Sequence, residues 1–127
     1  MSKEKFHIEC VFNKGGKTSL WNYVSTPAGL SEWFADEVTA DDNVFTFVWD
    51  NYPSKAELLA VSSGNFIRFR WLEDETSDTY FEFRIHKNEL TGGLLLEIVD
   101  FATPEEKDDA IVLWENEIKI LKRILGL

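Results

Sequence analysis

The chain has 127 residues, a size typical of one domain with a single core, and 44% of them are hydrophobic and 14% aromatic, which argues against long disordered segments. Its formal net charge of -10 at pH 7 excludes nucleic acid as a favourable partner, because phosphate binding depends on clustered Lys and Arg. No apolar run approaches the ~20 residues that span a bilayer, so we expect one domain over residues 1–127 without membrane insertion.

The first quarter of the chain predicts one strand and two short helices. Apolar and polar residues alternate over residues 6–12, the pattern of a half-buried strand, and a turn follows at residues 13–16. A short helix around Trp21 comes next. Thr26 is a suitable N-cap, and Pro27 suits the first helical position, so a second short helix begins there.

Residues 44–101 read as strands joined by turns, and the turns predict how the strands pair. A two-residue turn at Asp50 and Asn51 places Phe45 opposite Ala56. Apolar side chains then face each other across this hairpin, as expected for one buried face.

Two further turns continue the same face. A turn at residues 62–65 places Ala60 opposite Ile67, and the acidic loop at residues 73–79 places Phe69 opposite Phe83. On the other side of the sheet, oppositely charged residues meet: Glu57 lies across from Arg70, and Arg70 in turn from Glu82. The pairing therefore predicts a sheet with one aromatic and aliphatic face and one charged face.

The C-terminal part of the chain predicts a last strand and a long helix. The strand covers residues 94–101, and Thr103 and Pro104 then provide the cap and first position of a helix, with Glu106 completing a capping box. We expect this helix to run to about Leu125, because apolar residues recur at spacings of three and four along it.

This order of elements predicts an α+β protein with a helix-grip fold, in which a curved antiparallel sheet wraps around a long C-terminal helix and two short helices follow the first strand. The fold resembles that of the START-like (SRPBCC) superfamily. Residues 20–27 and 30–34 are similar to the branch of homologues of the heat-shock-protein-90 ATPase activator, and so are residues 96–102 with Trp114 and Leu121. The resemblance implies binding of apolar or amphipathic molecules between sheet and helix; some members are polyketide cyclases or aromatases, and others stimulate the chaperone ATPase.

The aromatic inner face allows two interpretations. It is either a filled core or the wall of a ligand cavity, and the small residues Ser54, Ala56 and Ala60 opposite bulky strands favour a void. The leading hypothesis is therefore binding of a small apolar or amphipathic molecule without catalysis. The predicted ligand-binding residues are Trp33, Phe34, Phe47, Trp49, Ser54, Ala56, Phe69, Trp71, Phe81, Phe83, Ile98, Trp114 and Ile118.

Two other functions follow from the resemblance. One is an interaction module that regulates a chaperone ATPase through an outer surface. The other is a cyclase-like enzyme, which needs an acid or base in the cavity; Asp100 is the candidate if its strand continues inward, whereas at a strand end it would cap or meet solvent.

The remaining reactive residue types predict neither a metal site nor a cofactor. Cys10 is the only cysteine, which excludes an internal disulfide, and alternation places it on the inner face, where buried thiols are usually unreactive. His7 and His86 are expected on the outer face, in no metal-ligand spacing. The N-terminus lacks the apolar segment of a signal peptide, so we expect a cytoplasmic protein.

Overall fold

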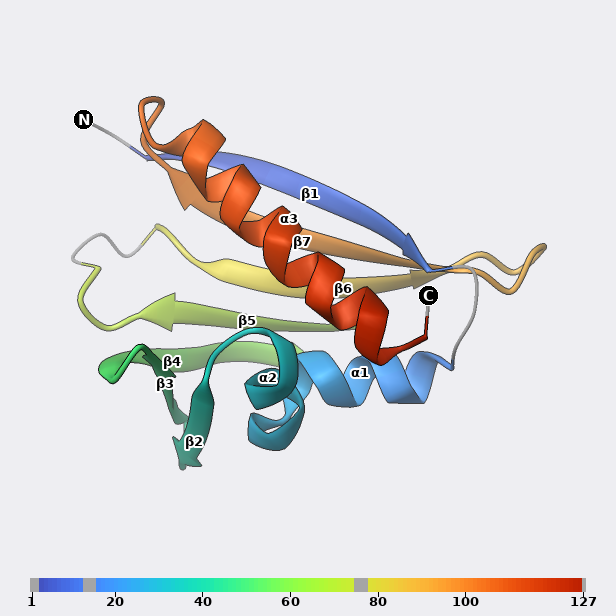
Figure 1. Ribbon diagram of the computed structural model, residues 1–127, viewed down its shortest axis with the longest axis horizontal. Coiled ribbons are helices and arrows are strands. Elements are labelled where there is room, and N and C mark those ends of the chain that lie inside the picture. The colour runs from blue at the N-terminus through green and yellow to red at the C-terminus, as the bar shows by residue number, and fades with distance from the viewer. Residues whose placement is uncertain (1–2, 13–15, 75–77, 127) are drawn as a thin grey trace.

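The computed structural model describes residues 3–12, 16–74 and 78–126, which form one antiparallel sheet and three helices (Figure 1). The strands are β1 (Glu4–Phe12), β2 (Glu37–Asp41), β3 (Val44–Trp49), β4 (Tyr52–Ser62), β5 (Phe66–Trp71), β6 (Phe81–Lys87) and β7 (Leu94–Ala102). The helices are α1 (Lys17–Ser25), α2 (Pro27–Trp33) and α3 (Lys107–Ile124). The sheet order is β1-β7-β6-β5-β4-β3-β2. Residues 13–15 of the predicted first turn and residues 75–77 of the acidic loop lie outside the described residues.

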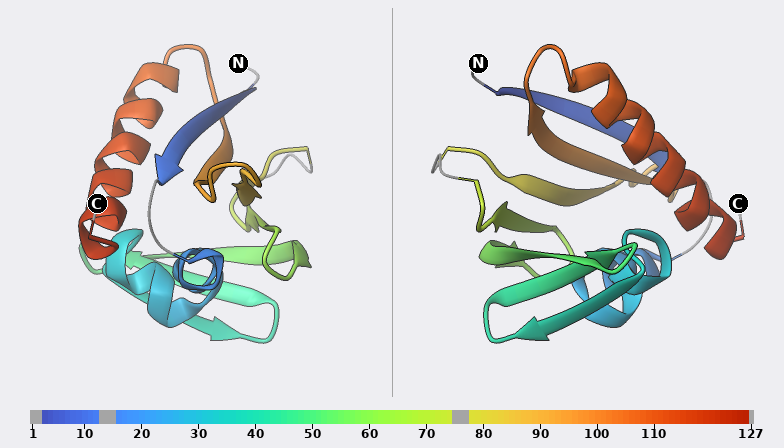
Figure 2. Two further views of the ribbon diagram at one scale, coloured as in Figure 1. Left: turned by 90° about the vertical axis from the view of Figure 1, so that its right-hand side faces the viewer. Right: turned by 60° about the vertical axis from the view of Figure 1, so that its left-hand side comes forward.

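The curved sheet wraps around one face of α3, and α1 and α2 close the lower end of the grip (Figures 1 and 2). Residues three and four apart on α3 point to the sheet: Trp114, Ile118 and Leu121 are buried. This arrangement confirms the predicted α+β helix-grip fold. Within the described residues, no helix has the length and apolar character needed to cross a membrane.

The long helix begins later than predicted, at Lys107 instead of Pro104. The hydroxyl of Thr103 donates to the Glu106 carboxylate at 2.8 Å, and the Glu106 N–H donates to the Thr103 carbonyl at 3.0 Å, so these residues close a turn instead of a capping box. No side chain of the described residues caps the helix start. Asp108 and Asp109 in the first turn stabilise it instead, because their negative charge interacts favourably with the helix dipole.

The hairpin between β3 and β4 forms as predicted, with Phe45 opposite Ala56. Asp50 and Asn51 have φ angles of 53° and 67°, the left-handed conformation that a two-residue turn of this kind requires. Strand β2 was not predicted. It is a short edge strand whose only buried residue is Val38, so it lacks the apolar alternation that identifies a half-buried strand.

Two of the predicted strand pairings are wrong, and for Ala60 the predicted inner face is wrong as well. A β-bulge between Leu58 and Ala60 shifts the register of β4, so that Ala60 pairs with Arg68 and no longer lies opposite Ile67. The pair β5–β6 is displaced by two residues, and Phe69 lies opposite Phe81 instead of Phe83.

The charged pairs on the outer face follow the true register. Arg68 Nε contacts the Glu82 carboxylate at 2.8 Å, while Arg70 contacts Glu57 at 3.1 Å. Arg70 therefore keeps its predicted partner on β4, and the predicted pair with Glu82 is wrong.

Helices α1 and α2 cross at a close backbone contact. Thr26 caps α2, since its hydroxyl accepts from the Gly29 N–H at 2.9 Å, and Pro27 occupies the first turn. At Gly29, an added Cβ would lie 2.1 Å from the carbonyl oxygen of Asn22 and 2.7 Å from the Cα of Tyr23. Both neighbours are backbone atoms, so the crossing depends on glycine at this position.

We expect Gly29→Ala to destabilise the protein by about 1 to 3 kcal/mol, because the methyl group forces α1 and α2 apart. Urea unfolding measures this loss. Gly16→Ala is the matched control, since a Cβ at Gly16 meets nothing within 4 Å. Equal stability of the two variants would contradict the assignment of a close crossing at Gly29.

Candidate functional site

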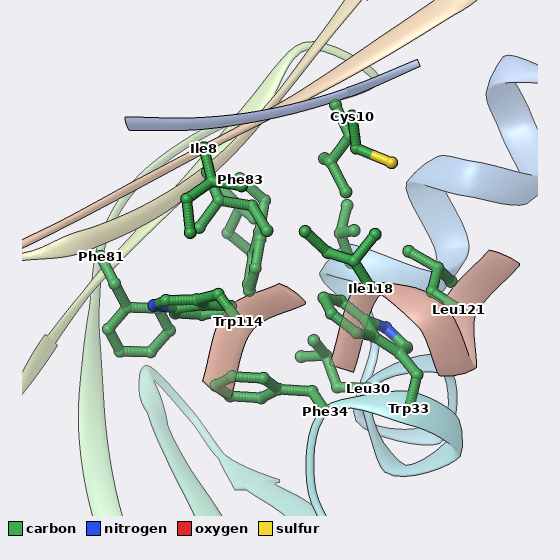
Figure 3. Close-up of a cluster of buried hydrophobic side chains, with 14 of the residues drawn as sticks. Ile8, Cys10, Leu30, Trp33, Phe34, Phe81, Phe83, Trp114, Ile118 and Leu121 are labelled. Atoms are coloured by element: carbon green, nitrogen blue, oxygen red, sulfur yellow. The ribbon is translucent and has the colours of Figure 1, made fainter. Parts of the chain in front are cut away.

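The space between the sheet and α3 is filled by aromatic rings. Phe34, which follows α2, stacks on Trp114 of α3 with ring centroids 5.3 Å apart and planes inclined by 13° (Figure 3). The Phe34 ring also makes T-shaped contacts with Phe47 and Phe83, at centroid distances of 5.2 Å and 5.8 Å. Phe34 therefore joins the helix layer to the central strands.

Most of the predicted ligand-binding residues lie in this core. Those that expose at most 1% of their surface are Phe47, Ala56, Phe69, Phe81, Phe83 and Ile98. Those that expose 3% to 7% are Trp33, Phe34, Trp114 and Ile118. These ten residues are buried in one core cluster, which fits the filled-core interpretation of the inner face.

The other three predicted residues line an open pocket. Trp49 at the end of β3 and Trp71 at the end of β5 are partly exposed, with ring centroids 6.0 Å apart, and Ser54 of β4 lies beside them. Together with Lys3 and the start of the acidic loop they enclose about 280 Å³, which we call the Trp49–Trp71 pocket. Lys3, which precedes β1, is one of its lining residues, so the pocket lies near the start of β1.

One wall of the Trp49–Trp71 pocket is charged. Lys3 Nζ lies 3.3 Å from the Asp74 carboxylate, which also accepts a hydrogen bond from the Thr79 hydroxyl. Lys3, Trp71 and Asp74 also line a smaller neighbouring pocket of about 120 Å³. The two pockets share these three residues and are therefore neighbours.

Asp100 borders the smaller pocket but is held by the core. Strand β7 continues past it to Ala102, and one carboxylate oxygen of Asp100 accepts from Trp114 Nε1 at 2.9 Å while the other accepts from the Phe101 N–H at 2.8 Å. Burial raises the pKa of Asp100, and these two hydrogen bonds offset part of the rise. Asp100 thus orients the indole ring of Trp114 in the core.

A second pocket, of about 380 Å³, lies between the end of α2 and the middle of α3. We call it the acidic aromatic pocket; its defining residues are Glu32, Trp33, Phe34, Asp36, Trp49 and Glu117. Sequence reasoning missed Glu117, although a signal existed: Glu117 lies at spacings of three and four from Trp114 and Leu121, within the apolar stripe. Burial raises the pKa of Glu117 to about 8, and its Oε2 atom is buried without a hydrogen-bond partner.

The outer face carries the two histidines, as predicted. His7 Nδ1 and His86 Nε2 lie 2.6 Å and 3.0 Å from the Glu97 carboxylate, and the hydrogen bond with His86 is the main cause that lowers the pKa of Glu97. Cys10 is buried on the inner face, and burial raises its pKa. In the part of the chain that the structure describes, no three His, Cys, Asp or Glu side chains are grouped so as to hold a metal ion.

Comparisons with known proteins give one family and a set of similar structures. A family model described as a START-like superfamily domain matches residues 1–127. BfR322 from Bacteroides fragilis, solved by solution NMR, is 44% identical, with 100% of this chain and 94% of that chain covered and a TM-score of 0.70. No protein with a curated description matches the chain.

Two more distant structures share the fold. The Aha1 dimer from Colwellia psychrerythraea has a TM-score of 0.81 at 10% identity, with 98% of this chain and 97% of that chain covered. CalU16 from Micromonospora echinospora has a TM-score of 0.77 at 17% identity, with 98% and 77% covered.

Proposed function

Because the chain belongs to the START-like superfamily, we propose that it binds a small amphipathic molecule, and that the site is the Trp49–Trp71 pocket. The observation that carries the proposal is the change in exposure along the inner face. Phe47 and Phe69 are fully buried, whereas the next inward-facing residues of the same strands, Trp49 and Trp71, are partly exposed and line a pocket. Exposed tryptophan faces at the open end of a filled core are suited to an apolar guest.

The polar lining defines the other half of the ligand. Trp49 Nε1 donates to the Phe34 carbonyl at 2.8 Å, so this indole offers the pocket its carbon surface. Lys3, Ser54 and Asp74 supply polar atoms on the remaining walls. A molecule with one aromatic or aliphatic part and one polar group therefore matches both sides of the pocket, and the buried rings behind the two tryptophans support them.

The size of the pocket limits the ligand. A pocket of about 280 Å³ lies at the lower limit of the usual range for small-molecule sites, roughly 300 to 1,000 Å³. A molecule of two or three aromatic rings or a short chain fits this volume, whereas a whole membrane lipid does not. From the sequence, we propose that this binding takes place in the cytoplasm.

We expect Trp71→Ala to weaken binding of the amphipathic probe 1-anilinonaphthalene-8-sulfonate about tenfold or more, because one aromatic wall is lost; tenfold corresponds to about 1.4 kcal/mol. Fluorescence titration measures the dissociation constant. Trp71→Phe should lose less affinity, and circular dichroism verifies that both variants are folded.

Trp21→Ala is the matched control for this titration. Trp21 is a half-buried tryptophan of α1 that packs against the core and does not line the Trp49–Trp71 pocket. Equal dissociation constants for wild type, Trp71→Ala and Trp21→Ala would overturn the proposed site.

The two other functions implied by the resemblance have weaker support. The likeness to the Aha1 structure is at 10% identity and concerns the fold alone. For a cyclase-like reaction, both carboxylate oxygens of Asp100 are already engaged with Trp114 and the backbone of Phe101. Neither function is supported by an observation comparable with the exposed tryptophans.

A further inference from the structure

The acidic aromatic pocket differs in chemistry from the Trp49–Trp71 pocket. Its carboxyl groups come from two elements, Glu32 and Asp36 from α2 and the segment after it, and Glu117 from α3. No Lys or Arg is among its lining residues. The pocket is thus an indentation of about 380 Å³ in which every ionisable lining side chain is a carboxyl group.

The Glu117 carboxyl has an unmet hydrogen-bonding capacity. Its Oε2 atom is buried and has no hydrogen-bond partner in the structure. A buried acceptor without a partner costs roughly 1 to 3 kcal/mol, and a bound donor group would recover this cost. A hydrogen-bond donor with positive charge fits this atom best, since it also favours the carboxylate form.

The aromatic surface of this pocket comes mainly from Trp49, which is partly exposed, because Trp33 and Phe34 expose only 3% and 5% of their surface, and neither indole N–H is free to donate. Trp33 Nε1 donates to the Tyr23 carbonyl at 2.7 Å, and Trp49 Nε1 is taken by the Phe34 carbonyl. Ring faces attract cations through their quadrupole, by about 0.5 to 2 kcal/mol each. Carboxylates and aromatic rings in one pocket are therefore complementary to the same ligand, an organic cation.

We propose that the acidic aromatic pocket binds an organic ammonium ion, with an N–H of the ligand donating to the Glu117 carboxylate and the carbon skeleton lying against Trp49. A metal ion is a poor alternative, since within the described ranges no three acidic or His/Cys side chains are grouped as metal ligands. The three carboxyl groups line a pocket of about 380 Å³, which has room for a small organic molecule.

Binding is linked to the protonation of Glu117. Because burial raises its pKa to about 8, the carboxyl is mostly protonated at pH 7 in the free protein. The charged groups that line the pocket with it are Glu32 and Asp36, and its neighbours one turn away on α3, Leu113 and Leu121, are uncharged. An ammonium ion favours the ionised carboxylate, so the proton of Glu117 is released to the buffer when the ligand binds at pH 7.

The test uses 2-phenylethylammonium as the probe and the neutral 2-phenylethanol as its matched compound. Isothermal titration calorimetry at pH 7, in two buffers with different enthalpies of ionisation, measures affinity and proton release. We expect the ammonium to bind at least tenfold more tightly than the alcohol, with a fraction of a proton released and with affinity that rises from pH 6 to pH 8.

Glu117→Gln should weaken ammonium binding tenfold or more and abolish proton release, because glutamine is close in shape to the protonated carboxyl but cannot ionise. Glu115→Gln, at an exposed site two residues away on α3, is the matched control. The indole N–H resonances of Trp33 and Trp49 should shift on binding.

Three results would overturn the inference: no binding of the ammonium at millimolar concentration, equal binding of the alcohol, or unchanged binding by Glu117→Gln. The naphthalene sulfonate probe reports on the other pocket. If it binds the wild type and the ammonium does not, this inference fails and the proposed function stands. If only the ammonium binds, the reverse holds.

Discussion

Truncation of Phe34 to alanine should lower the free energy of unfolding by about 3 to 5 kcal/mol, the usual cost of removing a large aromatic side chain from a core. Phe34 exposes only 5% of its surface, and its ring meets those of Trp114, Phe47 and Phe83. These neighbours come from α3, β3 and β6, and strands and helix cannot all move inward to fill one ring-sized space. The cavity therefore persists, and urea unfolding measures its cost.

Phe66→Ala is the matched control for this loss. Phe66 is half-buried on the outer face of β5, where the guanidinium group of Arg84 lies 4.4 Å from its ring centroid. We expect its truncation to cost about 1 kcal/mol, since water replaces much of the ring and little cavity forms. Equal losses for the two phenylalanines would contradict the assignment of Phe34 as the link between α3 and the sheet.

The position of Phe34 also explains why the interior is filled. The sequence left open whether the grip encloses a void or a core. The ring that follows α2 enters the space between sheet and helix and stacks on Trp114, so the protein fills this space with its own side chain. Both the Trp49–Trp71 pocket and the acidic aromatic pocket are lined by Trp49.

The sequence predicts which face of each strand is buried better than which residues pair. Alternation defines the face, and a displacement of two residues leaves it unchanged. This is why Phe69 lies on the predicted inner face while its partner is Phe81 and not Phe83. The strands β5 and β6 are joined by the acidic loop at residues 73–79. Its sequence contains no two-residue turn motif that would define the register.

The bulge in β4 has a similar origin. No glycine or proline marks the position between Leu58 and Ala60, so alternation alone could not predict the shift there. The bulge also removes one of the small residues on which the prediction of a void depends. The sequence predicts Ala60 as one of three small inner-face residues, whereas the bulge pairs it with Arg68.

The candidate site was predictable in part. Aromatic residues on the inner face identified Trp49 and Trp71, but pattern alone could not separate the partly exposed tryptophans from the buried phenylalanines behind them. That distinction depends on where the sheet ends and how far α3 extends over it. Glu117 shows the opposite case, since a single ionisable residue in an apolar stripe is a local signal that sequence alone contains.

Glu117→Gln should remove a specific pH dependence from the stability of the protein. The folded-state pKa of about 8 lies above the ordinary value of 4.5, so between these values the folded protein holds a proton that the unfolded chain has lost. The wild type is therefore most stable, with respect to this group, below pH 4.5, and this contribution is lost as the pH rises through 8.

The size of the effect follows from the shift. One pKa unit corresponds to about 1.4 kcal/mol, so the shift from 4.5 to about 8 has an upper limit of roughly 5 kcal/mol; we expect about 2 to 3 kcal/mol, because the exposed part of the side chain lets water screen the charge. Glutamine cannot ionise. The variant should thus match the wild type near pH 4.5 and exceed it in stability by this amount at pH 8.5.

Urea unfolding at a series of pH values, with Glu115→Gln as the control, measures the difference. Other carboxyls titrate in both proteins, including Asp100 and Glu97, so subtraction of the two curves leaves only the contribution of Glu117. A difference that stays constant between pH 4.5 and pH 8.5 would mean that Glu117 is ionised in the folded protein at neutral pH. The same measurement then bears on the ammonium site, since a carboxyl that is already ionised has no proton to release when a cation binds.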